Sequence, residues 1–209
     1  MGSQWSTGRI EAFSDGVFAI AITLLVLEIQ VPESDFGNLW YGIAHQWPSY
    51  LAYATSFLTI GGIWMAHHGM FRRLRFANQR VMVINLLLLM AVAFLPFPTK
   101  LMAETIHTNG PERAAAIFYG ASLLVTSVLI SALWRSVALD RGLLNPEVSD
   151  KEFYAILQAT TPSIGFYVVV ILLAIFVPQV APFGYLAIAA FAVLRARGDR
   201  APTSSADPA

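Results

Sequence analysis

Residues 13–29 read FSDGVFAIAITLLVLEI, an apolar run that opens with a carboxylate at Asp15. The apolar pattern extends over residues 10–31, and Pro32 ends it. About 20 mostly apolar residues suffice for a helix to cross the hydrocarbon core of a bilayer. The run is too long for the apolar part of a signal peptide, and no A-x-A-like site follows it. We therefore expect a retained membrane-spanning helix.

The whole chain has the composition of an integral membrane protein. Of its 209 residues, 56% are hydrophobic and 12% are charged, whereas about 25% of the residues of a soluble domain are charged. The formal net charge is zero and cysteine is absent. We therefore expect no nucleic-acid partner, disulfide, thiol catalysis or zinc–thiolate site. The sequence has no phosphate loop, nucleophile elbow or H-E-x-x-H motif, so neither an enzyme nor a cofactor is predicted.

Five further apolar segments follow, so the sequence predicts an all-α membrane protein with six transmembrane helices. Pro48 suits a first helical turn, and Ser149 and Glu152 have the spacing of a capping box. Pro96 and Pro98 are expected to bend the third helix. The predicted domain covers residues 1–195, and residues 196–209 form a polar tail that we expect to be disordered. The helices are predicted at about 10–31, 48–71, 81–104, 111–134, 152–177 and 182–194.

The distribution of positive charge predicts the orientation of these helices. If the N-terminus lies inside, only Lys100 and Arg113 among the 13 lysines and arginines fall outside or near the outer surface. Such an excess of positive charge on one side is typical of cytoplasmic loops. Both termini are therefore predicted to be cytoplasmic, in a multi-pass protein of the plasma membrane or inner membrane.

A helical projection divides the first helix into two faces. At about 100° per residue, Phe13, Ile20, Thr23, Leu24 and Leu27 share one face, and Asp15 lies roughly opposite Ile20. An unpaired charge deeper in the membrane costs several kcal/mol. Asp15 is therefore expected either in a buried network or, with Ser14, as a simple helix cap.

Several polar residues could pair with Asp15. Arg9 lies at the same helix end, while His67, His68 and Asn85 lie near the ends of the second and third helices. The histidines could instead be interfacial residues or part of a proton relay. Adjacent histidines point to different helix faces, so the pair is not expected to ligate one metal ion.

Residues 59–63, TIGGI, superficially resemble the TVGYG selectivity filter of known potassium channels. They lie inside a long predicted helix, however, with no short re-entrant segment to hold the backbone open. Gly61 and Gly62 are interpreted instead as sites of close helix packing.

Arg9 and the Phe13-Ser14-Asp15 triplet, followed by GVFAIAITLLVLEI, resemble the signature of the transmembrane protein 175 family of potassium channels. The single six-helix unit is similar to the prokaryotic branch of that family. The resemblance implies a homotetrameric, potassium-permeable cation channel without a TVGYG-type filter, whose first helices line the pore. Its partners would be copies of itself, the lipid bilayer and monovalent cations, with no cofactor and no metal beyond permeating potassium.

The resemblance also implies roles for individual residues. The pore constriction would be formed by Ile20, with further apolar layers at Leu24 and Leu27 and a hydroxyl layer at Thr23. The implied structural network consists of Arg9, Phe13, Ser14, Asp15, His67, His68 and Asn85.

Two other functions stay open at this point. In a proton-coupled secondary transporter or proton-conducting protein, Asp15 and the histidines would be proton sites, and prolines would mark broken helices. The sequence shows no paired inverted repeat to support a transporter. A non-conducting structural protein of the membrane is the third possibility.

Overall fold

A computed structural model of the chain describes residues 5–106, 110–149, 153 and 162–198. Its regular secondary structure is helical apart from two strands of two residues each, β1 (Trp5–Ser6) and β2 (Phe76–Ala77), which confirms the predicted all-α class. The helices are α1 (Thr7–Leu24), α2 (Leu39–His45), α3 (Trp47–Phe71), α4 (Gln79–Phe94), α5 (Pro96–Thr105), α6 (Pro111–Ala138), α8 (Pro162–Phe176) and α9 (Ala181–Gly198). Short 3₁₀ turns are η1 (Leu25–Glu28), η2 (Glu33–Asn38), η3 (Arg141–Leu143) and η4 (Pro178–Val180).

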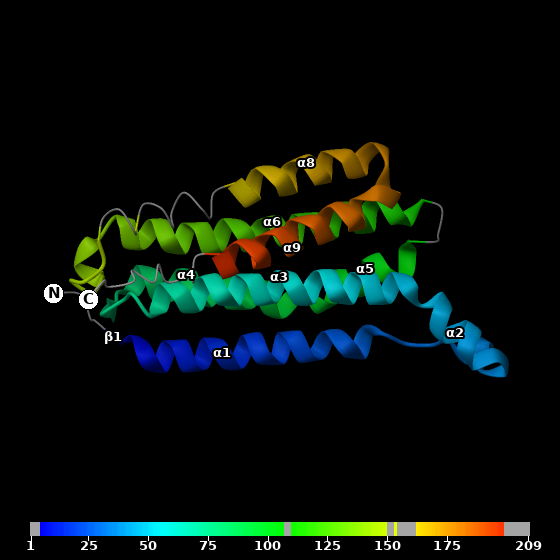
Figure 1. The fold of residues 1–209 in the computed structure, drawn as a ribbon, viewed down its shortest axis with the longest axis horizontal. Coiled ribbons are helices and arrows are strands. Elements are labelled where there is room, and N and C mark those ends of the chain that lie inside the picture. Colours follow the sequence, from blue (N-terminus) through cyan, green and yellow to red (C-terminus); the bar gives the residue numbers. More distant parts are fainter. Residues whose placement is uncertain (1–4, 107–109, 150–152, 154–161, 199–209) are drawn as a thin grey trace, which may run out of the picture.

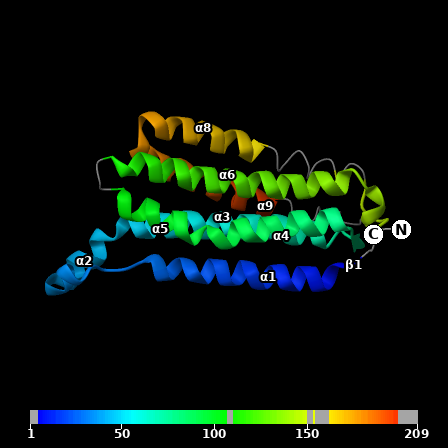
Figure 2. The ribbon, with the colours of Figure 1, turned by 180° about the vertical axis from the view of Figure 1, so that it is seen from behind.

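The long helices lie side by side in one elongated bundle, with α1 at one edge and α8 at the opposite edge (Figures 1 and 2). Helix α1 packs on α3 and α4, α3 packs on α9, and α6 packs on α8. The short helix α2 projects from the end of the bundle opposite to β1 (Figure 1). Because α1 has neighbours on one side only, its other face is free for contact with something outside this chain.

Three helical stretches of the described residues are long and apolar enough to cross a membrane: Thr7–Glu28, Gln79–Thr105 and Pro111–Ala138. The apolar stretches Ile164–Phe176 and Pro178–Leu194 are shorter. Helix α3 has 25 residues, but serines, threonines and two histidines make it less apolar. The chain is thus a membrane protein by composition and helix length, and the count of six spans stays a prediction.

Several helix bounds differ from those predicted. The predicted third helix, 81–104, is divided into α4 and α5 at Leu95, because Pro96 has no N–H for the helical ladder and its ring clashes with the preceding turn. The first helix ends at Glu28 rather than at residue 31, and Ile29 is extended. The side-chain amide of Gln30 donates a hydrogen bond of 3.2 Å to the Leu27 carbonyl, which satisfies one carbonyl of the last turn.

The later helices differ from their predicted bounds as well. The fourth continues to Ala138 rather than 134, and the last runs over Ala181–Gly198 rather than 182–194. Of the fifth, the structure describes Pro162–Phe176 and Phe153. The remainder of that predicted helix, and residues 199–209 of the predicted tail, lie outside the described residues.

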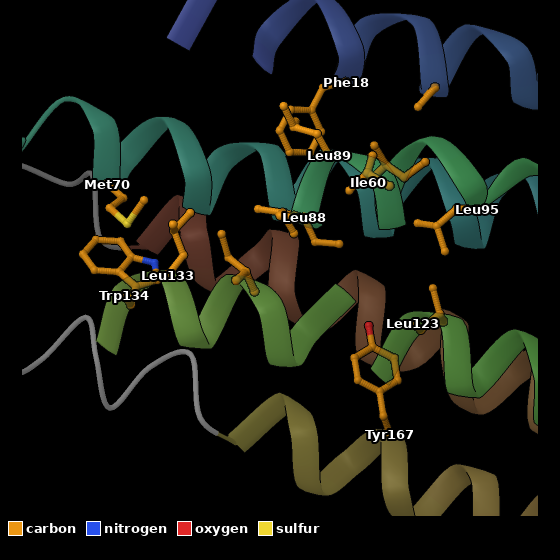
Figure 3. Close-up of a cluster of buried hydrophobic side chains, with 14 of the residues drawn as sticks. Phe18, Ile60, Met70, Leu88, Leu89, Leu95, Leu123, Leu133, Trp134 and Tyr167 are labelled. Atoms are coloured by element: carbon orange, nitrogen blue, oxygen red, sulfur yellow. The ribbon is translucent and has the colours of Figure 1, made fainter. Parts of the chain in front are cut away.

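The core is a continuous set of apolar side chains between the helices (Figure 3). Phe18 of α1, Leu88 of α4 and Trp134 of α6 are at most 1% exposed. In lipid, the surroundings are as apolar as the core, so packing and hydrogen bonds rather than water exclusion hold helices together. Buried polar contacts such as the Ser56–Tyr119 hydroxyl pair, 2.8 Å apart, therefore contribute to the fold.

Among the glycines that the structure describes, Gly120 of α6 leaves the least room for a Cβ atom. A Cβ atom there would lie 2.7 Å from Cγ1 of Ile171 and would also overlap the Tyr185 ring of α9. By contrast, a Cβ on Gly61 would meet no atom within 4 Å, and one on Gly62 would meet Val193 at an ordinary 3.7 Å. The close packing expected at the glycine pair is therefore found at Gly120, which lets α8 and α9 approach α6.

Replacing Gly120 with alanine is expected to lower the free energy of unfolding by about 1–3 kcal/mol, because the added methyl group overpacks a filled site. Thermal unfolding of the purified protein in detergent measures the change. Gly61→Ala is the matched control, since space is open there. An equal loss of stability in both variants would contradict the steric explanation.

Backbone pairing ties the start of α1 to the rest of the bundle. Trp5 pairs with Ala77 and Ser6 pairs with Phe76 in an antiparallel ladder. The same α3–α4 connection is joined to the segment after α6, where the Arg75 N–H donates to the Leu143 carbonyl at 2.8 Å. The first residues of α1, the α3–α4 connection and the end of α6 thus form one hydrogen-bonded layer.

Candidate functional site

Helix α1 and its short 3₁₀ extension η1 have one packed face and one free face. Ile10, Ser14, Phe18, Ala21 and Leu25 are buried against the bundle. The predicted pore residues lie on the other face, where the exposed fractions are 62% for Ile20, 41% for Leu24 and 63% for Leu27. The chain itself therefore leaves an apolar stripe of helical period uncovered.

Thr23 lies on the same free face and is exposed. Its hydroxyl donates a hydrogen bond of 2.9 Å to the Ile20 carbonyl. Because the proton is used within the helix, the hydroxyl oxygen turns lone pairs outward, and lone pairs can approach a cation.

Ser14, Asn85 and His67 form a buried polar chain between α1, α4 and α3. The Asn85 amide donates to Ser14 Oγ at 3.0 Å, and Asn85 Oδ1 lies 2.8 Å from His67 Nε2. Ser14 in turn donates to the Ile10 carbonyl at 2.8 Å. The three residues are at most 1% exposed. We call these three hydrogen-bonded residues the anchor. They fix the position of α1 along its axis, and its rotation about that axis, relative to α3 and α4.

The predicted network is divided into separate sets rather than joined. The side chain of Asp15 accepts a hydrogen bond of 2.8 Å from the Trp64 indole N–H. His68 Nδ1 lies 2.8 Å from Glu11 Oε1, and its ring stacks on Trp64. Asp15 is half-buried, and its hydrogen-bond partner in the structure is an indole rather than an arginine.

Two members of the predicted network lie apart from it. Arg9 is exposed, and within the described residues it makes no ion pair with Asp15. Phe13 is 59% exposed and lies on the same side as the apolar stripe. In the structure of one chain, these two side chains therefore lie outside the buried face of α1.

Sequence reasoning missed Glu11 and Trp64. Both could have been found from spacing, because Glu11 and Asp15 are four residues apart, as are Trp64 and His68. Residues at this spacing share one helix face. The signal is that each of the two neighbouring helices carries such a pair near the same end of the bundle. The helical projection considered α1 alone and therefore could not show it.

Known proteins resemble this chain over the region that carries these features. A family profile described as "Endosomal/lysosomal potassium channel TMEM175" matches residues 9–96. A protein of Streptomyces collinus named as a potassium channel is 44% identical over 143 residues, which are 68% of this chain and 69% of that protein. The vertebrate protein of Gallus gallus, named "Endosomal/lysosomal proton channel TMEM175", is 34% identical over 68% of this chain and 30% of its own length.

A solved structure resembles the fold as well. The crystal structure of a lysosomal potassium-selective channel TMEM175 homolog from Chamaesiphon minutus is 38% identical to this chain. The match covers 91% of this chain and 97% of the other, with a TM-score of 0.81. The similarity therefore extends over nearly all of the helical bundle.

Proposed function

This chain belongs to the TMEM175 family of ion channels, and from that premise we propose that four copies form a potassium-permeable channel whose pore is lined by α1. The names of two bacterial relatives support potassium as the permeating ion. We place the channel in the plasma membrane or inner membrane, with the N-terminal end of α1 on the cytoplasmic side.

The observation that carries the proposal is the uncovered apolar stripe of Ile20, Leu24 and Leu27. Helix α1 lies at the edge of the bundle, so its free face can meet the same face of another copy (Figure 1). The alternative occupant of an apolar face in a membrane is lipid. The exposed Thr23 among the apolar residues and the family profile over α1 favour the pore.

The proposed constriction acts by excluding water. A narrow ring of branched apolar side chains from four copies of Ile20 raises the free energy of a passing ion, and a small helix movement that widens the ring lets water return. Such a ring favours the ion that gives up its water more easily, which is potassium rather than sodium. Thr23, about one turn further along α1, would offer oxygen atoms to a partly dehydrated ion.

The first test concerns assembly. One helix cannot enclose a pore, and closed rotational symmetry is the common arrangement of identical chains. We expect native mass measurement of the purified protein to give four times the mass of the chain. A monomer or dimer that conducts ions would contradict the proposed pore.

The second test concerns transport itself. Protein reconstituted in liposomes with a potassium gradient is expected to carry a passive flux that does not saturate. Exchange that saturates and depends on a proton gradient would indicate a coupled carrier instead. Comparison with a sodium gradient measures the preference between the two ions.

Proton conduction is the second candidate, because the relative from Gallus gallus is named as a proton channel. A pH-sensitive dye inside the same liposomes distinguishes the two. Acidification that continues when potassium is replaced by an impermeant cation would favour a proton pathway.

A further inference from the structure

The first turns of α1 and the last turns of α3 face each other near the β1 end of the bundle. The two helices run antiparallel, and each presents two residues four positions apart. Glu11 lies beside His68, while Asp15 lies one turn further along, beside Trp64. One carboxylate pair on α1 thus faces one imidazole on α3.

The three groups that can donate an electron pair converge at this place. Ligand atoms of Glu11, Asp15 and His68 all lie within 4.8 Å of one another. In a metal site with bonds of about 2.0–2.2 Å, neighbouring ligand atoms are roughly 3–3.5 Å apart. Small rotations of the two carboxylates would bring the set to that spacing.

The imidazole nitrogen supplies the second observation. His68 Nδ1 is sheltered from solvent, and its contact with Glu11 lacks the geometry of a hydrogen bond. At 2.8 Å the His68 nitrogen and the Glu11 oxygen repel each other unless a proton or a metal ion lies between them. That particle is either a proton on Nδ1, carried by the neutral tautomer or by the charged ring, or a metal ion held by both atoms.

Trp64 favours the metal ion. Its N–H donates to one oxygen of Asp15, and its ring stacks on His68 at a centroid distance of 5.6 Å. One side chain therefore orients two of the three ligand groups, as outer-shell residues of metal sites do. Each carboxylate also retains a second oxygen for a ligand bond.

We propose that Glu11, Asp15 and His68 bind a divalent transition-metal ion such as Zn²⁺, with water completing the coordination. Two carboxylates and one imidazole suit zinc and similar first-row metals, whereas magnesium prefers oxygen ligands alone. The bound ion would connect α1 directly to α3. This site is separate from the anchor, since His67 uses its Nε2 atom for Asn85.

The test uses the full-length protein in detergent after treatment with a chelator. Equilibrium dialysis with Zn²⁺, read by elemental analysis, is expected to give one zinc per chain. Saturating zinc is expected to raise the thermal midpoint by about 5 °C, as a ligand well above its dissociation constant does. Mg²⁺ at the same concentration is expected to leave the midpoint unchanged.

Three variants separate the metal site from a simple ion pair. Glu11→Gln is expected to weaken zinc binding about a hundredfold, while Glu11→His, which restores a ligand, keeps it. Trp64→Phe retains the stacked ring but loses the N–H, and is expected to weaken binding about tenfold. The matched control is His45→Gln, on α2 at the opposite end of the bundle (Figure 1). It is expected to bind zinc as the native chain does.

Two results would overturn the proposal: a native chain that binds no stoichiometric zinc, or Glu11→Gln with unchanged zinc affinity. In either case the Glu11–His68 contact is a proton-bridged ion pair only. If Glu11→Gln does not fold, an unaltered affinity in Trp64→Phe together with lost binding in His45→Gln would equally overturn the assignment. These measurements need no ion flux, so they stand apart from the test of the channel.

Discussion

Replacement of Ile20 with asparagine is expected to raise potassium flux through reconstituted protein about tenfold and to reduce its preference for potassium over sodium. A tenfold rise corresponds to a barrier lowered by about 1.4 kcal/mol. Ile20 is 62% exposed in the single chain, so a polar side chain there does not disturb the core. Four amides in place of four branched apolar side chains would hold water at the constriction and lower the cost of a passing ion.

The control for this variant needs an equally exposed apolar residue away from the proposed pore. Ile22, on the other side of α1, does not qualify because it packs against the core. Leu172 of α8 is 54% exposed and lies on the helix at the far edge of the bundle. Liposome flux with potassium and with sodium measures both variants. A rise in Leu172→Asn equal to that in Ile20→Asn would mean that the pore face is assigned to the wrong helix.

Loss of the anchor is expected to have the largest effect on stability. Asn85→Ala leaves the buried His67 Nε2 without its partner and removes the hydrogen bond that Ser14 accepts, while the Ser14 hydroxyl still donates to the Ile10 carbonyl. The unsatisfied His67 nitrogen costs about 1–3 kcal/mol and the lost bond to Ser14 about 0.5–1.5 kcal/mol. A loss of roughly 1.5–4.5 kcal/mol in the free energy of unfolding is therefore expected, together with a lower yield of assembled protein.

Thermal unfolding in detergent, followed by native mass measurement, checks this expectation. Asn38→Ala is the matched control, because Asn38 is exposed and accepts a single hydrogen bond of 3.4 Å from the Tyr41 N–H. Its loss is expected to cost about 0.5–1 kcal/mol. Equal midpoints for the two variants would show that the buried chain of Ser14, Asn85 and His67 does not hold α1.

The sequence predicted those features that depend on one helix alone, such as which face a side chain lies on and where the helix breaks. The face of α1 that carries Ile20 could be read from the helical period, and the break before Pro96 from the chemistry of proline. The partners across helices could not be read in this way. Asp15 and Trp64 are 49 residues apart, and a projection of one helix tells which way a side chain points but not what it meets.

The glycines illustrate the same limit. A pair of adjacent glycines is a local signal, and it led to Gly61 and Gly62. The demand for a glycine at position 120 arises from Tyr185 and Ile171 on two other helices. The need for a glycine at position 120 can be recognised only when the positions of α6, α8 and α9 are known.

The ties that hold α1 in place all come from later parts of the chain. Ser14 cannot form its bond with Asn85 until 71 more residues have been made, and Trp5 cannot pair before Ala77 has been made. At a synthesis rate of about 5–20 residues per second, α1 would leave the ribosome roughly 4–14 s before these partners exist. Trp64 and His68 follow Asp15 and Glu11 by 49 and 57 residues, so α3 is made roughly 2–11 s after these carboxylates and before Asn85. Helix α1 is thus fixed in two steps, first against α3 and then against α4, and both of these helices are made before α6, α8 and α9.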